Sequence, residues 1–268
     1  MKQMTYIKLF AGLGNQIFQY VYGIYNELNG KNVFYILSRT KNDLIDIFEI
    51  ENKAKIFAPQ GRLKKLRLIL KKIWAKYIIR SYETGFYQEV RFVDYVNEKV
   101  DISKVLKFKN IEKYNKTKVY ENIKKNDNSI SIHIRGGDYL TAQDTYGGIC
   151  TAEYYKKAID FFDKKVDNCF FYIFTNDVEY SQELLSEINL STENFVIVQP
   201  EEDYCKNPGY DLYLMSKCKH NIIANSTFSW WGAYLNQNAN KIVITPSKWT
   251  NKEKNTLELI KPENWISL

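Results

Sequence analysis

The fold of this chain is decided by residues 130–138, ISIHIRGGD. Apolar and polar residues alternate as far as Ile134, which predicts a strand with a buried face. Gly136 and Gly137 then break the strand, and three ionisable side chains surround the break: His133, Arg135 and Asp138. Ligands of open parallel sheets bind beyond the carboxyl ends of the strands, so this end is a candidate binding site.

The residue types at this strand end suit a phosphate ligand. Arg135 offers a rigid fork of donors that matches phosphate oxygens, and the two glycines allow the backbone to approach a ligand closely. Asp138 could hold the guanidinium or accept a proton. The alternative is an ordinary turn with an Arg135–Asp138 pair on the surface, since short motifs often occur by chance.

Strands and helices alternate through the second half of the chain. We expect strands at 130–134, 170–174, 196–198, 220–224 and 241–245, and helices at 152–163, 179–188, 210–217 and 227–236. Thr151 is expected to cap the first of these helices. Loops should cover 139–150 and 200–209. This rhythm predicts a parallel, doubly wound sheet.

Three of these strand ends carry polar groups. The end at 133–138 is joined by Thr175-Asn176-Asp177 and by Asn225-Ser226-Thr227. The last group opens a helix, whose free backbone N–H groups and hydroxyls could bind an anion without a metal. Asp177 could take a ribose hydroxyl or a base N–H. Together they predict a nucleoside diphosphate pocket; the alternative is ordinary helix capping and an ordinary turn.

The amino-terminal half begins with a strand, a glycine loop and a buried helix, at 6–10, 11–16 and 17–25, before a second strand at 33–37. Ile17 replaces the third glycine of a dinucleotide fingerprint, which disfavours a nicotinamide cofactor. Gly12 and Gly14 could expose backbone to a ligand, while Asn15 and Gln16 present amides at the helix start. The alternative is a tight turn with Asn15 as the helix cap.

Charge and composition suggest a linker and one basic segment. The run KKNDN, 124–128, predicts a domain boundary, which gives domains at 1–125 and 126–246 and a tail at 247–268 that could return to the first domain. Segment 62–80 holds eight basic residues and no acidic ones. Without it, 30 basic and 31 acidic residues remain from 38 and 31, so nucleic acid is not an expected partner.

Segment 62–80 also has apolar residues at helical spacing, with Trp74 near the apolar stripe. A basic amphipathic helix of this kind suits an anionic membrane surface. The alternative is a helix packed on the first domain with a solvated basic face. Elsewhere in the first half, 82–92 should be a loop with a short strand. Residues 94–128 should include helices, and 103–106 and 119–123 are weak apolar anchors.

Several other chemistries fit the sequence poorly. Cys150, Cys169, Cys205 and Cys218 lack C-x-x-C spacing, and two histidines are too few for a histidine-rich metal site. The cysteines are expected to be reduced thiols in a cytoplasmic protein, and no signal peptide or long apolar run is evident. P-loop, G-x-S-x-G and D-x-D motifs are absent. The pair at 230–231, Trp-Trp, could stack on a sugar, although packing on the sheet is the expected role.

Four motifs together resemble the alpha-1,2-fucosyltransferases, glycosyltransferase family eleven. HIRGGDY at 133–139 resembles the family's H-x-R-R-x-D-Y motif. GLGNQIFQY at 12–20 and NSTFSWWGAYL at 225–235 are similar to its terminal signatures, and FTND at 174–177 resembles a weaker middle motif. They occur in the family's order over nearly the whole chain.

The resemblance implies an α/β fold of the GT-B type, with two Rossmann-like domains and a cleft between them. It also implies a metal-independent, inverting transfer of L-fucose from GDP-fucose, with no cofactor, to the 2-hydroxyl of a terminal galactose. The donor would bind the second domain, and a beta-galactoside glycan acceptor would bind the cleft and first domain. The donor-binding residues carried over are Gly14, Asn15, His133, Arg135, Asp177, Asn225, Ser226, Thr227 and Phe228.

Within this set, the resemblance implies that Arg135 clamps the β-phosphate and that residues 226–228 hold the diphosphate. His133 and Asp177 would contact the nucleoside or orient its neighbours, and Asn15 would reach the fucose or diphosphate. The catalytic set is Arg135, Asp138 and Asn15, with Asp138 and His133 as alternative bases.

The sequence departs from the family pattern in two places. Gly136 stands where the family has a second arginine, and Asp177 is the one acidic residue left in the middle motif. Two other functions therefore stay open: a transferase using another GDP-sugar or linkage, and a non-catalytic nucleotide- or glycan-binding protein.

Overall fold

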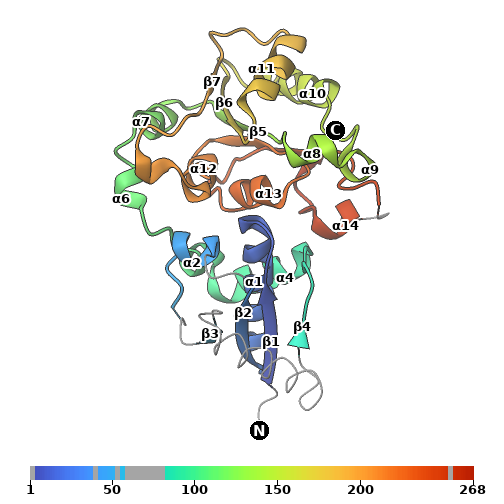
Figure 1. Cartoon of the computed structure of the whole chain (residues 1–268). Helices are drawn as coiled ribbons and strands as arrows, with labels where there is room; N and C mark the ends of the chain where they lie inside the picture. The colour runs from blue at the N-terminus through green and yellow to red at the C-terminus, as the bar shows by residue number, and fades with distance from the viewer. Residues whose placement is uncertain (1–3, 39–41, 52–54, 58–81, 253–255) are drawn as a thin grey trace. The chain divides into compact units, whose positions relative to one another are not determined.

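The computed structural model describes residues 4–38, 42–51, 55–57, 82–252 and 256–268 (Figure 1). By its contacts the chain divides into two compact units, 1–109 and 110–268. Each unit is built around a sheet in which all the described strand pairs are parallel. The basic segment 62–80 lies outside the described residues.

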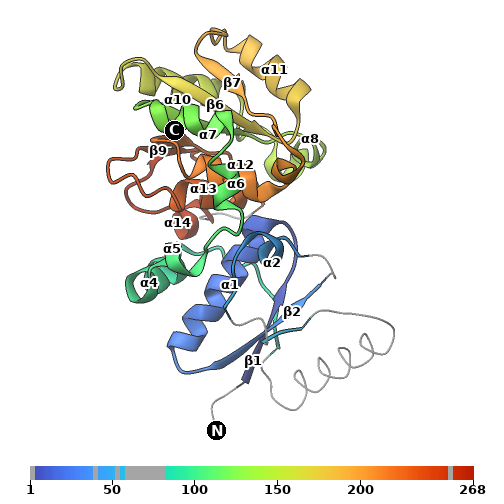
Figure 2. The same ribbon diagram turned by 90° about the vertical axis from the view of Figure 1, so that its left-hand side faces the viewer.

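The first unit contains a four-stranded sheet in the order β3-β2-β1-β4. Its strands are β1 (Met4–Leu9), β2 (Asn32–Leu37), β3 (Ile56–Phe57) and β4 (Tyr82–Glu83); its helices include α1 (Leu13–Leu28), α2 (Asp43–Ile47), α4 (Val90–Val100) and α5 (Ile102–Val105). Figure 2 shows α1 running alongside β1 and β2. The two long strands and the first helix confirm the predicted unit at the amino terminus.

The second unit contains a six-stranded sheet in the order β10-β9-β8-β5-β6-β7. The strands are β5 (Ser129–Ile134), β6 (Phe170–Thr175), β7 (Phe195–Ile197), β8 (His220–Ile222), β9 (Val243–Thr245) and β10 (Ile266–Ser267). The chain enters at β5, moves out to β7, and returns to β8 on the other side of β5. This is the doubly wound arrangement that was predicted, with its switch point between β5 and β8.

Helices cover both faces of this second sheet. The longer ones are α10 (Ala152–Asp163), α11 (Val178–Glu187), α12 (Pro208–Met215) and α13 (Thr227–Tyr234). Figure 1 shows α10 and α11 on one side of the strands and α12 and α13 on the other. Every residue of β5 is buried, as expected for a strand covered on both faces. The predicted Thr151 cap is confirmed, because its side chain accepts a hydrogen bond from the N–H of Tyr154.

The unit boundary differs from the sequence prediction of 125/126. Helices α6 (Ile111–Tyr114) and α7 (Lys118–Lys125) belong to the second unit. The ring of Tyr114 lies 5.3 Å from that of Tyr210, and Glu201 accepts hydrogen bonds from two N–H groups at the start of α7. These contacts join segments about 80 to 100 positions apart, which local composition does not reveal.

Smaller corrections concern loops and the tail. The expected loop 139–150 contains helices α8 (Asp138–Thr141) and α9 (Gln143–Tyr146), and 200–209 contains a 3₁₀ turn at Asp203–Cys205. The tail belongs to the second unit, where β10 pairs with β9. Trp230 and Trp231 are fully buried, and Nε1 of Trp230 donates to the carbonyl of Ile260, so neither ring is available to a sugar.

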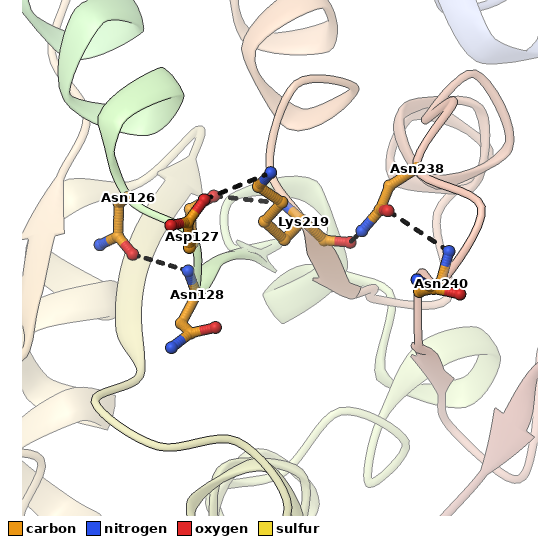
Figure 3. Close-up of polar contacts among 7 residues, drawn as sticks. Asn126, Asp127, Asn128, Lys219, Asn238 and Asn240 are labelled. Carbon is orange, nitrogen blue, oxygen red and sulfur yellow. Dashed lines mark hydrogen bonds and ion pairs between the residues drawn. The ribbon is translucent and has the colours of Figure 1, made fainter.

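The amino ends of β5 and β8 are closed by a polar network (Figure 3). The backbone of Lys219 bonds Ser129 and Asn238, and its Nζ lies 3.8 Å from Asp127. A groove of about 710 Å³ lies beside this network. Its lining has no arginine: Val119, Asn122, Lys125, Asn126, Asp127, Asn128, Asn168, Phe170, Tyr172 and Val196. The predicted phosphate-binding groups Arg135 and Ser226 follow β5 and β8 at the opposite, carboxyl edge of the sheet.

Candidate functional site

The sheet order places the three predicted strand ends side by side. Ile132 of β5 pairs with Ile222 of β8. Arg135 comes three residues after Ile132 and Asn225 three residues after Ile222, so both follow neighbouring strands at the same edge of the sheet. Ile134 pairs with Thr175 of β6, which brings residues 175–177 to the same edge. The expected grouping of these strand ends is confirmed, although their ligand contacts stay predictions.

The glycine loop after β5 is held by the end of β6. The N–H of Gly136 donates to Oδ1 of Asn176 at 3.0 Å, and the N–H of Gly137 donates to Oδ2 of Asp177 at 3.2 Å. A Cβ at position 136 would lie 2.6 Å from Cβ of Asp177, and Gly137 has φ +61°. The glycine that replaces the second arginine of the resembled motif is thus matched to its neighbour, because a larger residue would collide with Asp177.

Asp177 serves the protein backbone. Besides accepting from Gly137, its carboxylate accepts from the N–H of Tyr180 at 3.2 Å and so caps α11. The Thr175 hydroxyl donates to the carbonyl of Asp177 and accepts from its N–H. The middle motif therefore has a clear role in fixing the glycine loop, and the nucleoside contact of Asp177 stays a prediction.

Asn225 is also committed to the protein. Its side chain is 3% exposed; Nδ2 donates to the carbonyl of Trp249 at 3.0 Å, and Oδ1 accepts from the Cys150 thiol at 3.3 Å. The donor contact carried over to this residue stays a prediction. What the geometry gives Asn225 is the positioning of the chain as it enters α13.

The start of α13 suits an anion. Ser226 is its N-cap residue but makes no side-chain capping hydrogen bond, and no acidic residue occupies its first turn. By contrast, α10, α11 and α12 each have a capping side chain and an acidic residue there. A helix start carries partial positive charge, and here the hydroxyls of Ser226 and Thr227 lie beside it.

Arg135 is supported by an aromatic pair. The centre of its guanidinium lies 5.2 Å from the ring centroid of Tyr139, which stacks on Tyr146 at 4.1 Å with an interplanar angle of 8°. The Tyr139 hydroxyl donates to the carbonyl of Asn225 at 3.1 Å. Tyr139 therefore supports the arginine and links it to the chain that follows β8. Sequence reasoning had proposed Asp138 as the residue that holds Arg135. Asp138 begins α8, but its side chain lies outside the described part of the structure.

His133 lies beneath the first turn of α13. It is 3% exposed, and its ring centroid lies 5.6 Å from that of Phe228. Burial, reinforced by the charge of Arg135, lowers the pKa of His133 to about 3. The imidazole is therefore neutral at physiological pH and poorly suited to act as a general base. Its Nδ1 makes no hydrogen bond with any described residue.

In the first unit, the side chains of Gln16 and Gln19 form hydrogen bonds that hold the glycine loop of the GLGNQIFQY motif. Nε2 of Gln16 donates to the carbonyl of Ala11 at 2.7 Å, its Oε1 accepts from the N–H of Leu44, and Oε1 of Gln19 accepts from the N–H of Phe10. Presentation of the Gln16 amide to a ligand is therefore wrong. Because α1 begins at Leu13 with Gly12 as N-cap, Asn15 is not the helix cap either.

Asn15 and Gly14 occupy the first turn of α1. Oδ1 of Asn15 accepts from Nε2 of Gln88 at 2.7 Å, while Gly14 is buried within the unit. Their predicted donor contacts stay predictions. The Gln88 partnership was missed by sequence reasoning because 73 positions separate the two amides.

Asp211 is a further residue that sequence reasoning missed. Met215 packs against Gly232, and α12 and α13 run parallel because both connect parallel strands. Asp211 lies one turn before Met215 in α12. Burial raises the pKa of Asp211 to about 7, and its carboxyl makes no hydrogen bond or ion pair with a described residue. The sequence does indicate it, because Asp211 is the single acidic residue in the otherwise largely apolar helix PGYDLYLM.

The described residues show neither a metal-binding cluster nor a membrane-spanning helix. They contain no group of three or more His, Cys, Asp or Glu side chains arranged to hold a metal ion. None of their helices combines the length and apolar character needed to cross a bilayer.

The fold is that of solved glycosyltransferases of the GT-B type. A family 9 glycosyltransferase from Veillonella parvula matches all of this chain and 87% of its own with a TM-score of 0.56, at 11% identity. The fucosyltransferase NodZ from Bradyrhizobium matches 87% of this chain and 92% of its own with a TM-score of 0.52, also at 11% identity. These likenesses concern the fold alone.

The family follows from the sequence comparison. The model of glycosyl transferase family 11 matches residues 1–268, so the chain belongs to that family. An alpha-1,2-colitosyltransferase from Escherichia coli is 27% identical over 97% of both chains. The O-antigen biosynthesis glycosyltransferase WbnK from Escherichia coli is 38% identical over 53% of this chain and 45% of its own. A galactoside alpha-(1,2)-fucosyltransferase 1 from Alouatta belzebul is 26% identical over 52% and 38%.

Proposed function

We propose that this protein is an inverting galactoside alpha-1,2-fucosyltransferase. It moves L-fucose from GDP-β-L-fucose to the 2-hydroxyl of a terminal galactose on a glycan or surface polysaccharide. Membership of family 11 supports a glycosyl transfer. The observation that carries the proposal is the placement of Arg135 beside the start of α13, at the switch point of a parallel sheet.

The chemistry follows from where charge develops. Transfer passes through an oxocarbenium-like state, and the departing GDP gains negative charge on its β-phosphate. The fixed guanidinium of Arg135 and the first-turn N–H groups of α13 stabilise that charge without a metal. Attack of the acceptor hydroxyl from the opposite face converts the β-linked donor into an α-linked product.

The remaining groups orient the donor. The hydroxyls of Ser226 and Thr227 hold the diphosphate, Phe228 covers it, and neutral His133 offers a ring nitrogen. Asn15 reaches the transferred sugar or the diphosphate, and Asp138 is the candidate for accepting the acceptor proton. Because the leaving group is good, a weak base suffices.

The test combines an activity assay with a binding assay. The protein is incubated with GDP-fucose and lactose in the presence of EDTA, and the product linkage is determined by NMR. We expect α-1,2-fucosyllactose and a rise in melting temperature with GDP. Arg135→Ala should lower kcat at least a thousandfold while the fold persists, because the main fixed charge on the leaving group is lost.

Arg91→Ala is the matched control. Arg91 belongs to the first unit, where its side chain is 71% exposed and pairs with Glu89 of the same unit. This variant should keep wild-type turnover. Normal turnover by Arg135→Ala would refute the site. Stabilisation by GDP with no transfer to any saccharide would favour a non-catalytic binding protein.

A second donor is favoured by one observation, the full-length match to an alpha-1,2-colitosyltransferase. Colitose is L-fucose without its 3-hydroxyl group. A site that hydrogen-bonds this hydroxyl would discriminate strongly against the deoxy sugar. Comparing kcat/KM for the two GDP-sugars separates the donors, and a higher value for GDP-colitose would replace the fucosyl assignment.

We also propose where the enzyme acts in the cell. The enzyme works in the cytoplasm at the inner face of the membrane, where segment 62–80 would meet anionic lipid. Eight basic residues without an acidic one support this contact.

A further inference from the structure

Two loops of the first unit leave neighbouring strand ends. β1 pairs in parallel with β4, with Tyr6 opposite Tyr82 and Ile7 opposite Glu83. Residues 10–12 and 84–88 therefore emerge at the same carboxyl edge of this sheet. Ligands of parallel α/β sheets bind beyond that edge. Arg135 and the start of α13, which are proposed to bind the phosphates, belong to the other unit.

The second of these loops displays an aromatic ring. Phe86 is 47% exposed, although its ring centroid lies only 5.0 Å from that of Phe10. The next residue faces inward, because Tyr87 stacks on Tyr22 at 3.9 Å with an interplanar angle of 6°. A Cβ on Gly85 would lie 2.9 Å from the Tyr87 ring. The inward tyrosine anchors the loop and leaves Phe86 turned outward.

Both loops hold a costly backbone conformation. Ala11 has φ +64° and Tyr87 has φ +52°, values that L-residues rarely adopt. Each costs on the order of 1 kcal/mol, and such strain persists where the surroundings enforce it. The Gln16 and Gln19 amides enforce it in the first loop. The pair of loops is thus built as a rigid surface.

An amide completes this surface. Gln88 lies two residues after Phe86, and its Nε2 donates to Oδ1 of Asn15 at 2.7 Å. This bond fixes the orientation of the amide. Oε1 of Gln88 makes no hydrogen bond with any described residue and is available as an acceptor. Nζ of Lys8 lies 4.9 Å from the centroid of the Phe10 ring.

An exposed ring beside a fixed, neutral amide matches a saccharide. A pyranose presents a face of C–H groups, which packs on an aromatic ring, and an edge of hydroxyls, which bond amides. We propose that Phe86 and Gln88 form the subsite for the acceptor saccharide, with Phe86 stacking on its ring and Oε1 of Gln88 accepting from a hydroxyl. This inference rests on the proposed function and assigns its acceptor contacts.

The experiment separates acceptor binding from donor binding. Phe86→Ala, Phe86→Trp and Gln88→Leu are compared with wild type for the acceptor KM, the donor KM and the rate of GDP-fucose hydrolysis without acceptor. Phe86→Ala should raise the acceptor KM about tenfold, with the donor KM and hydrolysis rate unchanged. Gln88→Leu should raise the acceptor KM by a similar factor, and it should also change the hydrolysis rate because it removes the donor that holds Asn15. Phe86→Trp should restore the acceptor KM, because stacking needs only an aromatic face.

Leu28→Ala is the matched control, since Leu28 is 39% exposed at the far end of α1 in the same unit. It should leave both KM values unchanged. An unchanged acceptor KM in Phe86→Ala, or equal rises in the acceptor and donor KM, would overturn the subsite. No transfer by the wild type would instead overturn the proposed function, so the two failures are distinguishable.

Discussion

At the scale of single residues, the candidate site combines residues that are predicted to bind the ligand with residues that hold them in place. Tyr139 supports Arg135 and ties it to the end of β8. The Asp177 carboxylate accepts from backbone N–H groups, and the Asn225 amide bonds the Trp249 carbonyl and the Cys150 thiol. These motif residues therefore fix the backbone around the site through contacts within the protein.

Gly136 gives a prediction at this scale. Gly136→Ala would place a Cβ 2.6 Å from Cβ of Asp177, so the loop must shift and lose its two hydrogen bonds to the end of β6. We expect a loss of about 1–3 kcal/mol in the free energy of unfolding, with weaker GDP binding. Urea unfolding and calorimetric titration with GDP measure the two effects.

Gly12→Ala controls for the general cost of adding a methyl group. Gly12 has φ −73°, and a Cβ there meets nothing within 4 Å, so its free energy of unfolding should change little. Equal stability of Gly136→Ala and wild type would show that the glycine is not fitted to Asp177.

At the scale of elements, the helices of the second unit differ in how their first turns are capped. Capping side chains occupy the starts of α10, α11 and α12, whereas the start of α13 has neither a capping hydrogen bond nor an acid. The exception lies at the switch point, where an anion can take the place of the cap.

Helix α12 carries a pH-dependent element. Burial raises the pKa of Asp211 from 3.8 to about 7. Between these values the unfolded chain has released the proton while the folded chain keeps it, so this residue lowers stability as pH rises through that window. We expect Asp211→Asn to be more stable than wild type at pH 8 and to lose this advantage near pH 4.

Urea unfolding of both proteins at several pH values measures this difference. Asp203→Asn, at a side chain that is 95% exposed, controls for the removal of a negative charge. A stability difference that did not change with pH would contradict the buried setting of Asp211.

At the scale of the whole molecule, the net charge of +7 is concentrated in segment 62–80. We expect the protein to sediment with vesicles containing anionic lipid, and 0.5 M salt to release it, because the attraction is screened within a Debye length of about 4–5 Å at that concentration. Replacing Lys64, Lys65, Lys71 and Lys72 by Gln should abolish sedimentation. Equal binding to neutral vesicles would show that charge does not direct the contact.

The sequence by itself determined the alternation of strands and helices, because the spacing of apolar residues within each segment indicates a strand or a helix. The β5 strand, the Thr151 cap and the grouping of the three polar strand ends were all predictable in this way. Helix α10 matched the predicted range of 152–163. The motifs likewise pointed to the family to which the chain belongs.

Only the tertiary structure decided which polar atoms are already used. The glycine loop bonds residues 40 positions away, Asn225 meets Cys150 at a separation of 75, and Tyr139 reaches Asn225 across 86. The unit boundary at 109/110 depends on similar distant contacts. Such partners are set by strand order and helix packing, which bring together segments whose local sequences carry no record of one another.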